Sequence, residues 1–242
     1  YATIASHSMD AIPDRLKPHW DRKVTKRCVM TIPYNAKPFS NRSYIRDAFK
    51  EKGVDVTKEE LTQCVSAVRA AMNVVVPGAM NVMKWIETEI SRAIKAGAPE
   101  IRWTTPSGFI VKQKLMKTAK STIESQLMGR VKISISGAET GVDLKHHKNA
   151  TAPNLIHSLD ASLLHIAMTD VDFPIALIHD SVLCRATDMC TLSTLVRKTY
   201  MSLFAEHEPL TDFALAIGAE ELPPIIGDLK PEAVIDSQYF FC

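Results

Sequence analysis

The residues that constrain the fold most are 175–184, where an acidic residue stands between two short apolar runs. The runs Ile175–Ile178 and Val182–Cys184 have the length and composition of β-strands. An ionised carboxylate is costly to bury without a partner, so Asp180 needs hydrogen bonds or a cation. We therefore predict a tight hairpin with Asp180 at its tip. An ordinary Asp turn and a magnesium ligand are both compatible with this pattern.

A basic helix is predicted over residues 21–32, because proline at position 33 cannot donate a hydrogen bond to the preceding turn. Its first two turns carry four cationic residues: Arg22, Lys23, Lys26 and Arg27. These charges oppose the helix dipole, and only Asp21, the predicted N-cap, offsets them. An anion such as a phosphate bound across this end would explain the arrangement. A solvated basic face is the alternative.

Four residues of the same segment are spaced by four: Arg22, Lys26, Met30 and Tyr34. Each step of four residues turns by about 40° around a helix, so they form one slowly drifting stripe. Lys26 and Tyr34 would lie about 12 Å apart along the axis. One face could thus hold phosphates at one end and present an aromatic hydroxyl to a sugar at the other.

The rest of the chain predicts an α+β fold that is mainly helical. Thr57-Lys58-Glu59-Glu60 is a capping box, and Pro77-Gly78 ends the helix that this box opens. Further helices are predicted at about 79–95, 113–128, 157–169, 187–205 and 211–217, and hairpins over 101–111 and 131–144. No apolar stretch approaches 18 residues, so no membrane span is expected. Five cysteines without CxxC spacing favour neither a disulfide framework nor zinc.

Four segments together resemble the single-subunit RNA polymerases of phages and mitochondria. They are 21–34 (similar to the O-helix pattern R-x3-K-x7-Y), 103–109 (similar to W-x-T-P-x-G-F), 152–160 (similar to PNF-hydrophobic-HSxD) and 176–181 (similar to the palm HDS motif). They occur in the family's order, and the aromatic end 239–242 resembles the family's C-terminal foot. The resemblance implies a right-hand polymerase fold, with fingers over 1–156, including an O helix at about 21–34, and the C-terminal palm over 157–242.

The resemblance also implies DNA-templated RNA synthesis, in which ribonucleoside triphosphates are joined by a two-metal mechanism that uses Mg²⁺. Arg22 and Lys26 would bind the triphosphate and neutralise its charge. Tyr34 would sense the ribose 2′-hydroxyl, and His157 would contact the nucleotide or the primer–template. Asp180 would ligate magnesium. Catalysis would thus depend on Lys26, Tyr34 and Asp180.

A predicted hairpin at about 130–145 falls where this family carries its promoter-specificity loop. A two-stranded ribbon fits the major groove of DNA. The candidate base readers are Arg130, Lys132 and Ser134, and the basic run 145–148 is expected to contact phosphate. A surface hairpin with solvated charges is the alternative.

The chain departs from the family pattern in two ways. Asn35 stands where glycine usually follows the tyrosine, although asparagine tolerates left-handed backbone better than most residues. No second carboxylate has a setting like that of Asp180, whereas two-metal transfer usually needs two carboxylates. We therefore expect the first catalytic Asp to lie upstream of this chain, which would be a C-terminal fragment that is inactive alone.

Two alternatives stay open at this point. Family A DNA polymerases share the R-x3-K-x7-Y spacing, but they usually carry a bulky aromatic residue where Met30 stands, and HDE where residues 179–181 read HDS. The other alternative is a non-catalytic nucleic-acid-binding remnant.

For an RNA polymerase, the expected partners are a double-stranded DNA template or promoter, the RNA product and ribonucleoside triphosphates. No membrane partner is expected, and we expect the intact form to be monomeric. The expected location is the cytoplasm of an infected bacterial host, with the mitochondrial matrix as the alternative.

Overall fold

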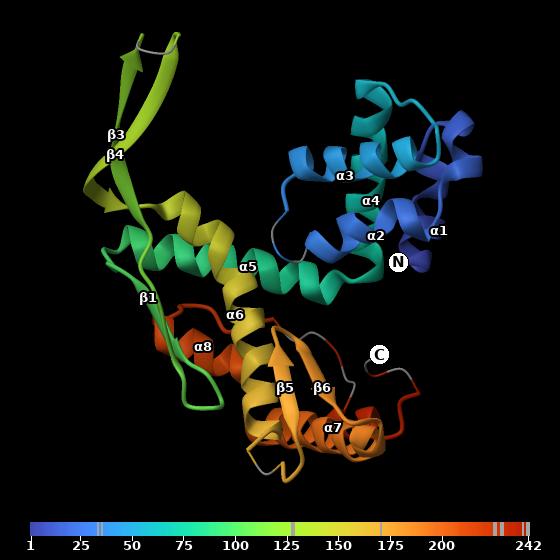
Figure 1. Ribbon diagram of the computed structural model, residues 1–242, viewed down its shortest axis with the longest axis vertical. Helices are drawn as coiled ribbons and strands as arrows, with labels where there is room; N and C mark the ends of the chain where they lie inside the picture. The colour runs from blue at the N-terminus through green and yellow to red at the C-terminus, as the bar shows by residue number, and fades with distance from the viewer. Residues whose placement is uncertain are drawn as a thin grey trace. The chain divides into compact units, whose positions relative to one another are not determined.

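The computed structural model (Figure 1) describes residues 1–32, 34, 36–126, 129–169, 171–224, 227, 230–238 and 240. Its internal contacts divide the chain into two compact units. Unit 1 comprises Tyr1–Glu87, Ala152–His157 and Pro223–Lys230, and unit 2 comprises Thr88–Thr151, Ser158–Leu222 and Pro231–Cys242. This division reflects packing, and the fingers–palm boundary near residue 156 stays a prediction.

Unit 1 is built around four helices: α1 (Ala2–Ser8), α2 (Arg22–Thr31), α3 (Pro38–Glu51) and α4 (Lys58–Val75). Two short 3₁₀ helices, Met9–Ala11 and Asp14–His19, connect α1 to α2. The helices bury one face each around a common core, which includes Leu16, Val24, Cys28, Ile45, Phe49, Leu61 and Cys64. Burying each large apolar side chain stabilises the fold by roughly 1.5–3 kcal/mol. This packing fixes which face of α2 is left exposed.

The start of α4 confirms the predicted capping box. The Thr57 side chain accepts a hydrogen bond from the Glu60 N–H, and the Glu60 carboxylate accepts one from the Thr57 N–H. Glu60 also pairs with Arg15, which lowers the pKa of this carboxyl group to about 2. The predicted break at residues 77–78 is confirmed as well, because α4 ends at Val75 and α5 (Pro77–Lys95) begins with the proline.

Unit 2 contains three separate two-stranded antiparallel sheets: β1 (Ile101–Thr104) with β2 (Ile110–Gln113), β3 (Met116–Ser125) with β4 (Val131–Val142), and β5 (Ile175–Ile178) with β6 (Ser181–Cys184). Its helices are α7 (Met189–Glu206), α8 (Pro209–Ile217) and parts of α5 and of α6 (Leu144–Ala167), with short 3₁₀ helices at Ala186–Asp188 and Pro231–Val234. The predicted α+β class, mainly helical, is confirmed.

Trp103 positions the first hairpin of unit 2. Its side chain is buried, its indole N–H donates to the Ser158 hydroxyl at 3.0 Å, and its ring meets Phe213 of α8 edge-on at 5.5 Å. A buried indole needs such a partner for its N–H. The tryptophan of the 103–109 motif therefore ties β1 to α6 and α8.

The predicted helix at 113–128 is wrong. Residues 116–125 of this stretch form β3, which pairs with β4 in a long hairpin (Figure 1). The hairpin predicted over 131–144 is wrong as well, because residues 131–142 form one continuous strand. The residues of β3 have no clear preference for helix or strand. Their cross-strand partners in β4, such as Ile133 opposite Ile123, stabilise the strand. Long-range pairing of this kind leaves no local signal.

The predicted helix at 157–169 is much longer than expected. α6 begins at Leu144, with the Asp143 side chain accepting from the His146 N–H as its N-cap, and it continues through Pro153. The basic run 145–148 is therefore part of a helix and not of the hairpin. Proline usually ends or kinks a helix, but Pro153 lies inside α6.

Among the described residues, no single helix has the length and apolar content needed to cross a membrane. The consecutive helices α4 and α5 together have sufficient length and apolar content, but the pair is bent by 101° at the break between them.

Candidate functional site

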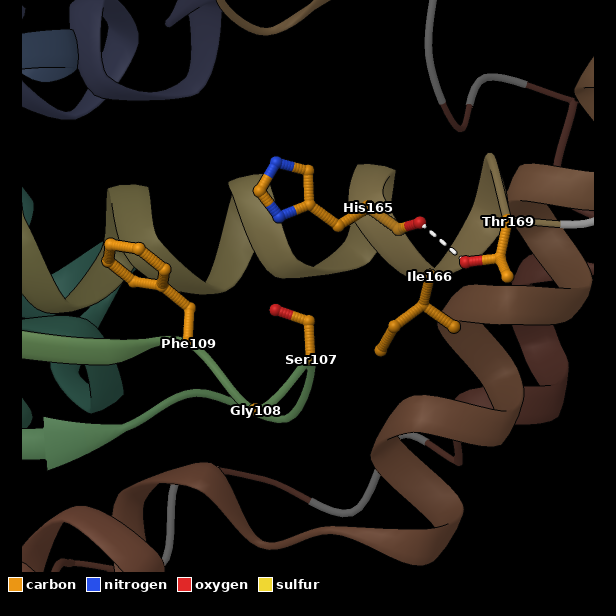
Figure 2. Close-up of a pocket in the computed structure, with 6 residues that line it drawn as sticks. All are labelled: Ser107, Gly108, Phe109, His165, Ile166 and Thr169. Carbon is orange, nitrogen blue, oxygen red and sulfur yellow. Dashed lines mark hydrogen bonds between the residues drawn. The ribbon is translucent and has the colours of Figure 1, made fainter.

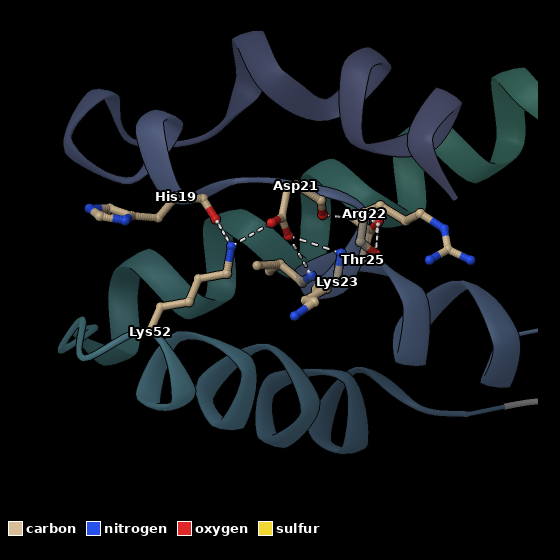
Figure 3. A network of polar contacts seen from close by, with 7 residues as sticks. His19, Asp21, Arg22, Lys23, Thr25 and Lys52 are labelled. Carbon is tan, nitrogen blue, oxygen red and sulfur yellow. Dashed lines mark hydrogen bonds and ion pairs between the residues drawn. The ribbon is translucent and has the colours of Figure 1, made fainter.

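The basic start of α2 is capped as predicted (Figure 3). One carboxylate oxygen of Asp21 accepts from the N–H groups of Lys23 and Val24 at 2.9 and 3.2 Å, and the other lies 2.6 Å from Lys52 Nζ. Burial would raise the pKa of Asp21, but Lys52 and the two N–H groups outweigh it and lower that pKa. Because Asp21 already occupies these N–H groups, an added anion would have to be bound by side chains.

The predicted stripe on α2 lies on the exposed face of the helix. Arg22, Lys26, Met30 and Tyr34 are all exposed, whereas Val24, Thr25 and Cys28 on the other side are buried. Arg22 lies over the Tyr1 ring, 5.5 Å from its centre. Within the described part of the chain, Lys26 has no ion-pair partner. The cationic part of the stripe is thus open to a ligand.

Two residues that the sequence predicted separately are brought together in unit 1. The rings of Tyr34 and His157 stack with centroids 4.9 Å apart and an interplanar angle of 28°. His157 comes from the middle of α6, far away in the sequence, yet it belongs to the same compact unit as α2. Pro33 and Asn35, which flank the tyrosine, lie outside the described residues.

Arg69 is a positioning residue that sequence reasoning missed. Its guanidinium, extending from α4, donates at 3.0 Å both to the Ala36 carbonyl and to the Asn41 side-chain oxygen. The Ala36 and Tyr34 N–H groups in turn donate to the Thr31 carbonyl. These bonds hold Tyr34 and Ala36 against the end of α2. No local pattern in the sequence marks Arg69, because its partners Ala36 and Asn41 belong to a distant segment.

Asp180 lies at the tip of the predicted hairpin, which is confirmed with the register Ile175↔Cys184 to Ile178↔Ser181. His179 has a φ of 56°, in the left-handed region that tight turns use. The argument from burial was wrong, because Asp180 is exposed and so are Ile178 and Leu183, at 54% and 55%. Water can therefore solvate the Asp180 carboxylate at this turn.

A magnesium ion fits such a tip only in part. Among the described residues, no group of three or more His, Cys, Asp or Glu is placed to hold a metal. Magnesium, however, is often held by one or two protein carboxylates together with phosphate oxygens and water. An exposed carboxylate on a short, tight turn meets that requirement for one ligand.

The β3–β4 hairpin has two different faces. The pairs Thr122↔Ser134 and Glu124↔Lys132 alternate with pairs that contain Ile123, Val131, Ile133 and Ile135. Two candidate readers, Lys132 and Ser134, therefore share the polar face. Glu124 lies between the charged candidates, 2.8 Å from Lys132 Nζ and 3.4 Å from the Arg130 guanidinium.

His147 does not contact phosphate, contrary to the expectation for the run 145–148. It is fully buried, its Nε2 accepts from the Leu115 N–H at 3.2 Å, and its Nδ1 lies 3.0 Å from the Gln113 amide. Gln113 also donates to Thr151, whose hydroxyl donates to the His147 carbonyl. Burial lowers the pKa of His147. This network fastens β2 and the base of the long hairpin to α6.

Of the aromatic C-terminal run, only Phe240 is among the described residues. It packs on α7, with the Arg197 guanidinium 5.3 Å from its ring centre and the Tyr200 ring edge-on at 5.1 Å. Arg197 also donates to the Ser237 carbonyl at 2.7 Å. Phe240 is therefore anchored on α7, while the likeness of residues 239–242 to the family's C-terminal foot stays a prediction.

Comparison with known proteins identifies the class of protein. A family profile described as DNA-dependent RNA polymerase matches residues 3–221. The chain is 28% identical over 236 residues to the DNA-directed RNA polymerase of Pseudomonas phage phiKMV, covering 92% of this chain and 29% of the relative. It is 28% identical over 233 residues to the chloroplastic DNA-directed RNA polymerase 3B of Nicotiana tabacum, covering 91% of this chain and 23% of that protein. With DNA-directed RNA polymerase 2A of the same plant, it is 29% identical over 235 residues, which cover 91% of this chain and 69% of the relative.

These matches place the chain among nucleic-acid polymerases, and specifically among those that make RNA. It belongs to the DNA-dependent RNA polymerase family, in the branch found in phages and organelles. The predicted resemblance is confirmed, and the matches argue against the DNA polymerase alternative. The chain spans less than a third of the length of the phage and chloroplast relatives it matches.

Proposed function

We propose that this chain supplies the nucleotide-binding helix and one metal ligand of a polymerase that copies DNA into RNA. The observation that carries the proposal is the exposed stripe of α2, cationic at one end and closed at the other by the stacked rings of Tyr34 and His157. Family membership adds that this chemistry is RNA synthesis. A right-hand fold, with fingers over 1–156 and palm over 157–242, is part of the proposal.

On α2, we assign the triphosphate to the two exposed cations. Arg22 and Lys26 neutralise the phosphate charges, which grow during transfer of the nucleotidyl group. Tyr34, about two turns further along, presents its hydroxyl to the ribose 2′-hydroxyl. His157 keeps the tyrosine ring in one orientation through the stack.

In unit 2, we assign Mg²⁺ to Asp180. A bound Mg²⁺ ion would neutralise phosphate charge and make the attacking oxygen a better nucleophile. Asp180 offers one carboxylate on a turn that the left-handed His179 keeps short. A two-metal mechanism needs a further carboxylate, which we assign to polymerase sequence outside these 242 residues. The phage relative is more than three times as long as its matched region, which supports this assignment.

The polar face of the β3–β4 hairpin is assigned to promoter DNA, with Lys132, Ser134 and the adjacent Arg130 as readers in the major groove. The partners of the whole polymerase are then double-stranded DNA, the RNA product and ribonucleoside triphosphates. Relatives from a phage and from plant organelles support the cytoplasm of an infected bacterium as the location, with an organelle as the alternative.

Nucleotide binding by the 242-residue chain tests the assignment of α2. We expect Lys26→Ala to weaken binding of a fluorescent ribonucleoside triphosphate by about tenfold or more, because a charge-assisted hydrogen bond contributes about 1.5–3 kcal/mol. Lys50→Ala is the matched control, since Lys50 is an exposed lysine of α3 in the same unit. Equal affinities of the two variants would contradict the assignment.

A non-catalytic nucleic-acid-binding module is the second candidate. It is favoured by the lack, among the described residues, of a group of three metal-ligating side chains. Primer extension by a longer polymerase that contains this chain separates the two candidates, because only a polymerase adds ribonucleotides to a primed template.

A further inference from the structure

Unit 2 contains a cavity that no assignment above uses. It has a volume of about 350 Å³. The turn between β1 and β2 lines one side with Ser107, Gly108 and Phe109, and the end of α6 lines the other with His165, Ile166 and Thr169 (Figure 2). Ligand sites span roughly 300–1,000 Å³, so this cavity is at the small end and suits a single ring system.

The turn that forms one wall is held rigidly on α6. The Ser107 N–H donates to the buried Ser162 hydroxyl at 2.7 Å. The Gly108 N–H donates to the Thr105 carbonyl at 2.8 Å, and the Phe109 N–H donates to the Thr105 hydroxyl at 3.2 Å. Gly108 has a φ of +82°, which favours glycine and makes the turn tight. The wall is therefore formed before any ligand arrives, which lowers the entropic cost of binding.

Phe109 is unusually exposed to solvent for a phenylalanine. Its side chain is 62% exposed although Trp103, in the same hairpin, is fully packed. Figure 2 shows its ring on the wall of the cavity, with the His165 imidazole on the facing helix. An exposed aromatic ring at the side of a small cavity is a surface on which a flat ring can stack.

The polar groups of the cavity are neutral hydrogen-bonding groups. Ser107 and Thr169 contribute hydroxyls and His165 contributes ring nitrogens, while the described lining residues include no Lys, Arg, Asp or Glu. A phosphate would find no cationic side chain here. Ser107 Oγ lies 3.1 Å from Thr105 Oγ1, and the Thr169 hydroxyl donates to the His165 carbonyl at 3.0 Å. Each hydroxyl oxygen still has acceptor capacity for a donor on a ligand. A flat heterocycle with donors and acceptors along its edge satisfies both the ring and the polar groups.

We propose that this cavity binds one unstacked nucleobase of a single-stranded nucleic acid. Phe109 stacks on the base, and Ser107 and His165 contact its polar edge. The inference rests on the proposed function, since a polymerase handles single strands of both template and product. Base–aromatic stacking tolerates any sequence because every base has a π-face, so the site grips a strand without selecting its sequence.

The experiment compares oligonucleotides of about 12 nucleotides, within the length that single-strand binding domains cover, with abasic strands of the same length and charge. Binding of each to the 242-residue chain is followed by fluorescence anisotropy. The ratio of the two affinities isolates the bases, because phosphate contacts are equal. We expect a ratio of about ten for the unsubstituted chain, and a severalfold smaller ratio for Phe109→Ala.

Two further variants complete the design. Phe109→Trp retains a stacking ring and should keep the ratio. Leu215→Ala removes an apolar side chain from α8 that is 73% exposed and lies outside the cavity, and this variant should also keep the ratio. Because Phe109 is largely exposed, we expect Phe109→Ala to keep the thermal unfolding midpoint, which is measured alongside. Ribose and deoxyribose versions of each strand show whether product or template is the better ligand.

An unchanged ratio in Phe109→Ala would overturn the proposed site. The proposed function would survive that result if Lys26→Ala still weakened nucleotide binding, so the two failures are distinguishable. A ratio near one in the unsubstituted chain would also overturn the site. Self-association that depends on Phe109, together with a ratio near one, would assign the surface to a protein contact instead.

Discussion

A tyrosine hydroxyl distinguishes ribose from deoxyribose only if its ring is held in one place. Tyr34 is held by the stack on His157 and by its N–H, which donates to the Thr31 carbonyl at 3.1 Å. Arg69 fixes the next described residue, Ala36, through its carbonyl. The residue proposed to select the sugar is thus positioned by a histidine and an arginine that are assigned no contact with the sugar.

Removing the hydroxyl alone should change selection and leave binding largely intact. We expect Tyr34→Phe to bind a ribonucleoside triphosphate and its deoxy counterpart with nearly equal affinity, because a lost neutral hydrogen bond of about 0.5–1.5 kcal/mol removes a preference of that size. Competition binding against one fluorescent nucleotide measures the ratio. A ribose preference that persisted in Tyr34→Phe would assign sugar recognition to another residue.

At the scale of elements, the β3–β4 hairpin depends on a buried histidine at its base. His147 accepts from Leu115, just before β3, and faces Gln113 at the end of β2, so its imidazole connects two hairpins to α6. Its neighbour His146 is exposed, with only its backbone N–H engaged at the N-cap. Adjacent histidines in one helix thus have different roles.

This difference gives a matched pair of variants. We expect His147→Ala to lower the free energy of unfolding by about 1–3 kcal/mol, because the partly buried Leu115 N–H loses its acceptor and the buried imidazole is removed. His146→Ala should change it by less than about 0.5 kcal/mol, as exposed substitutions usually do. Urea unfolding at pH 7.5 or so measures both. Equal losses in the two variants would contradict the role of the buried network.

The burial of His147 also predicts that the stability of the fold depends on pH. The folded state lowers the pKa of His147 below its ordinary value of about 6.5. The unfolded chain therefore binds the proton first, so stability is fully present above about pH 6.5 and declines as the pH falls below it. In His147→Ala this part of the decline should be absent.

At the scale of the whole molecule, the proposed metal ligand Asp180 gives the most direct test of catalysis. In a polymerase that contains this chain and extends a primer, we expect Asp180→Asn to lower the rate of ribonucleotide addition by more than a hundredfold, because a neutral amide is a poor magnesium ligand. Primer extension at saturating nucleotide measures the rate. A rate near that of the unsubstituted enzyme would remove Asp180 from the mechanism.

The sequence predicted what is decided locally. The cap at Asp21, the capping box at Thr57 and the hairpin around Asp180 each depend on residues within a few positions, and all three are confirmed. The identity of β3 depends on its pairing with β4, and the burial of His147 depends on Gln113 and Leu115 in other elements, so neither follows from the residues of one segment alone. Tyr34 and His157 were singled out separately through the family motifs, and their contact was not predicted, because stacking between distant segments leaves no periodicity.

The β5–β6 hairpin has a practical consequence for the chain in solution. Val182 and Cys184 pack against unit 2, but the other face shows Ile178 and Leu183 to water, and neither strand has a further neighbour among the described residues. Open strand edges beside apolar side chains promote aggregation. Hydrophobic attraction weakens on cooling, so dilute, cold solutions should keep this chain dispersed best.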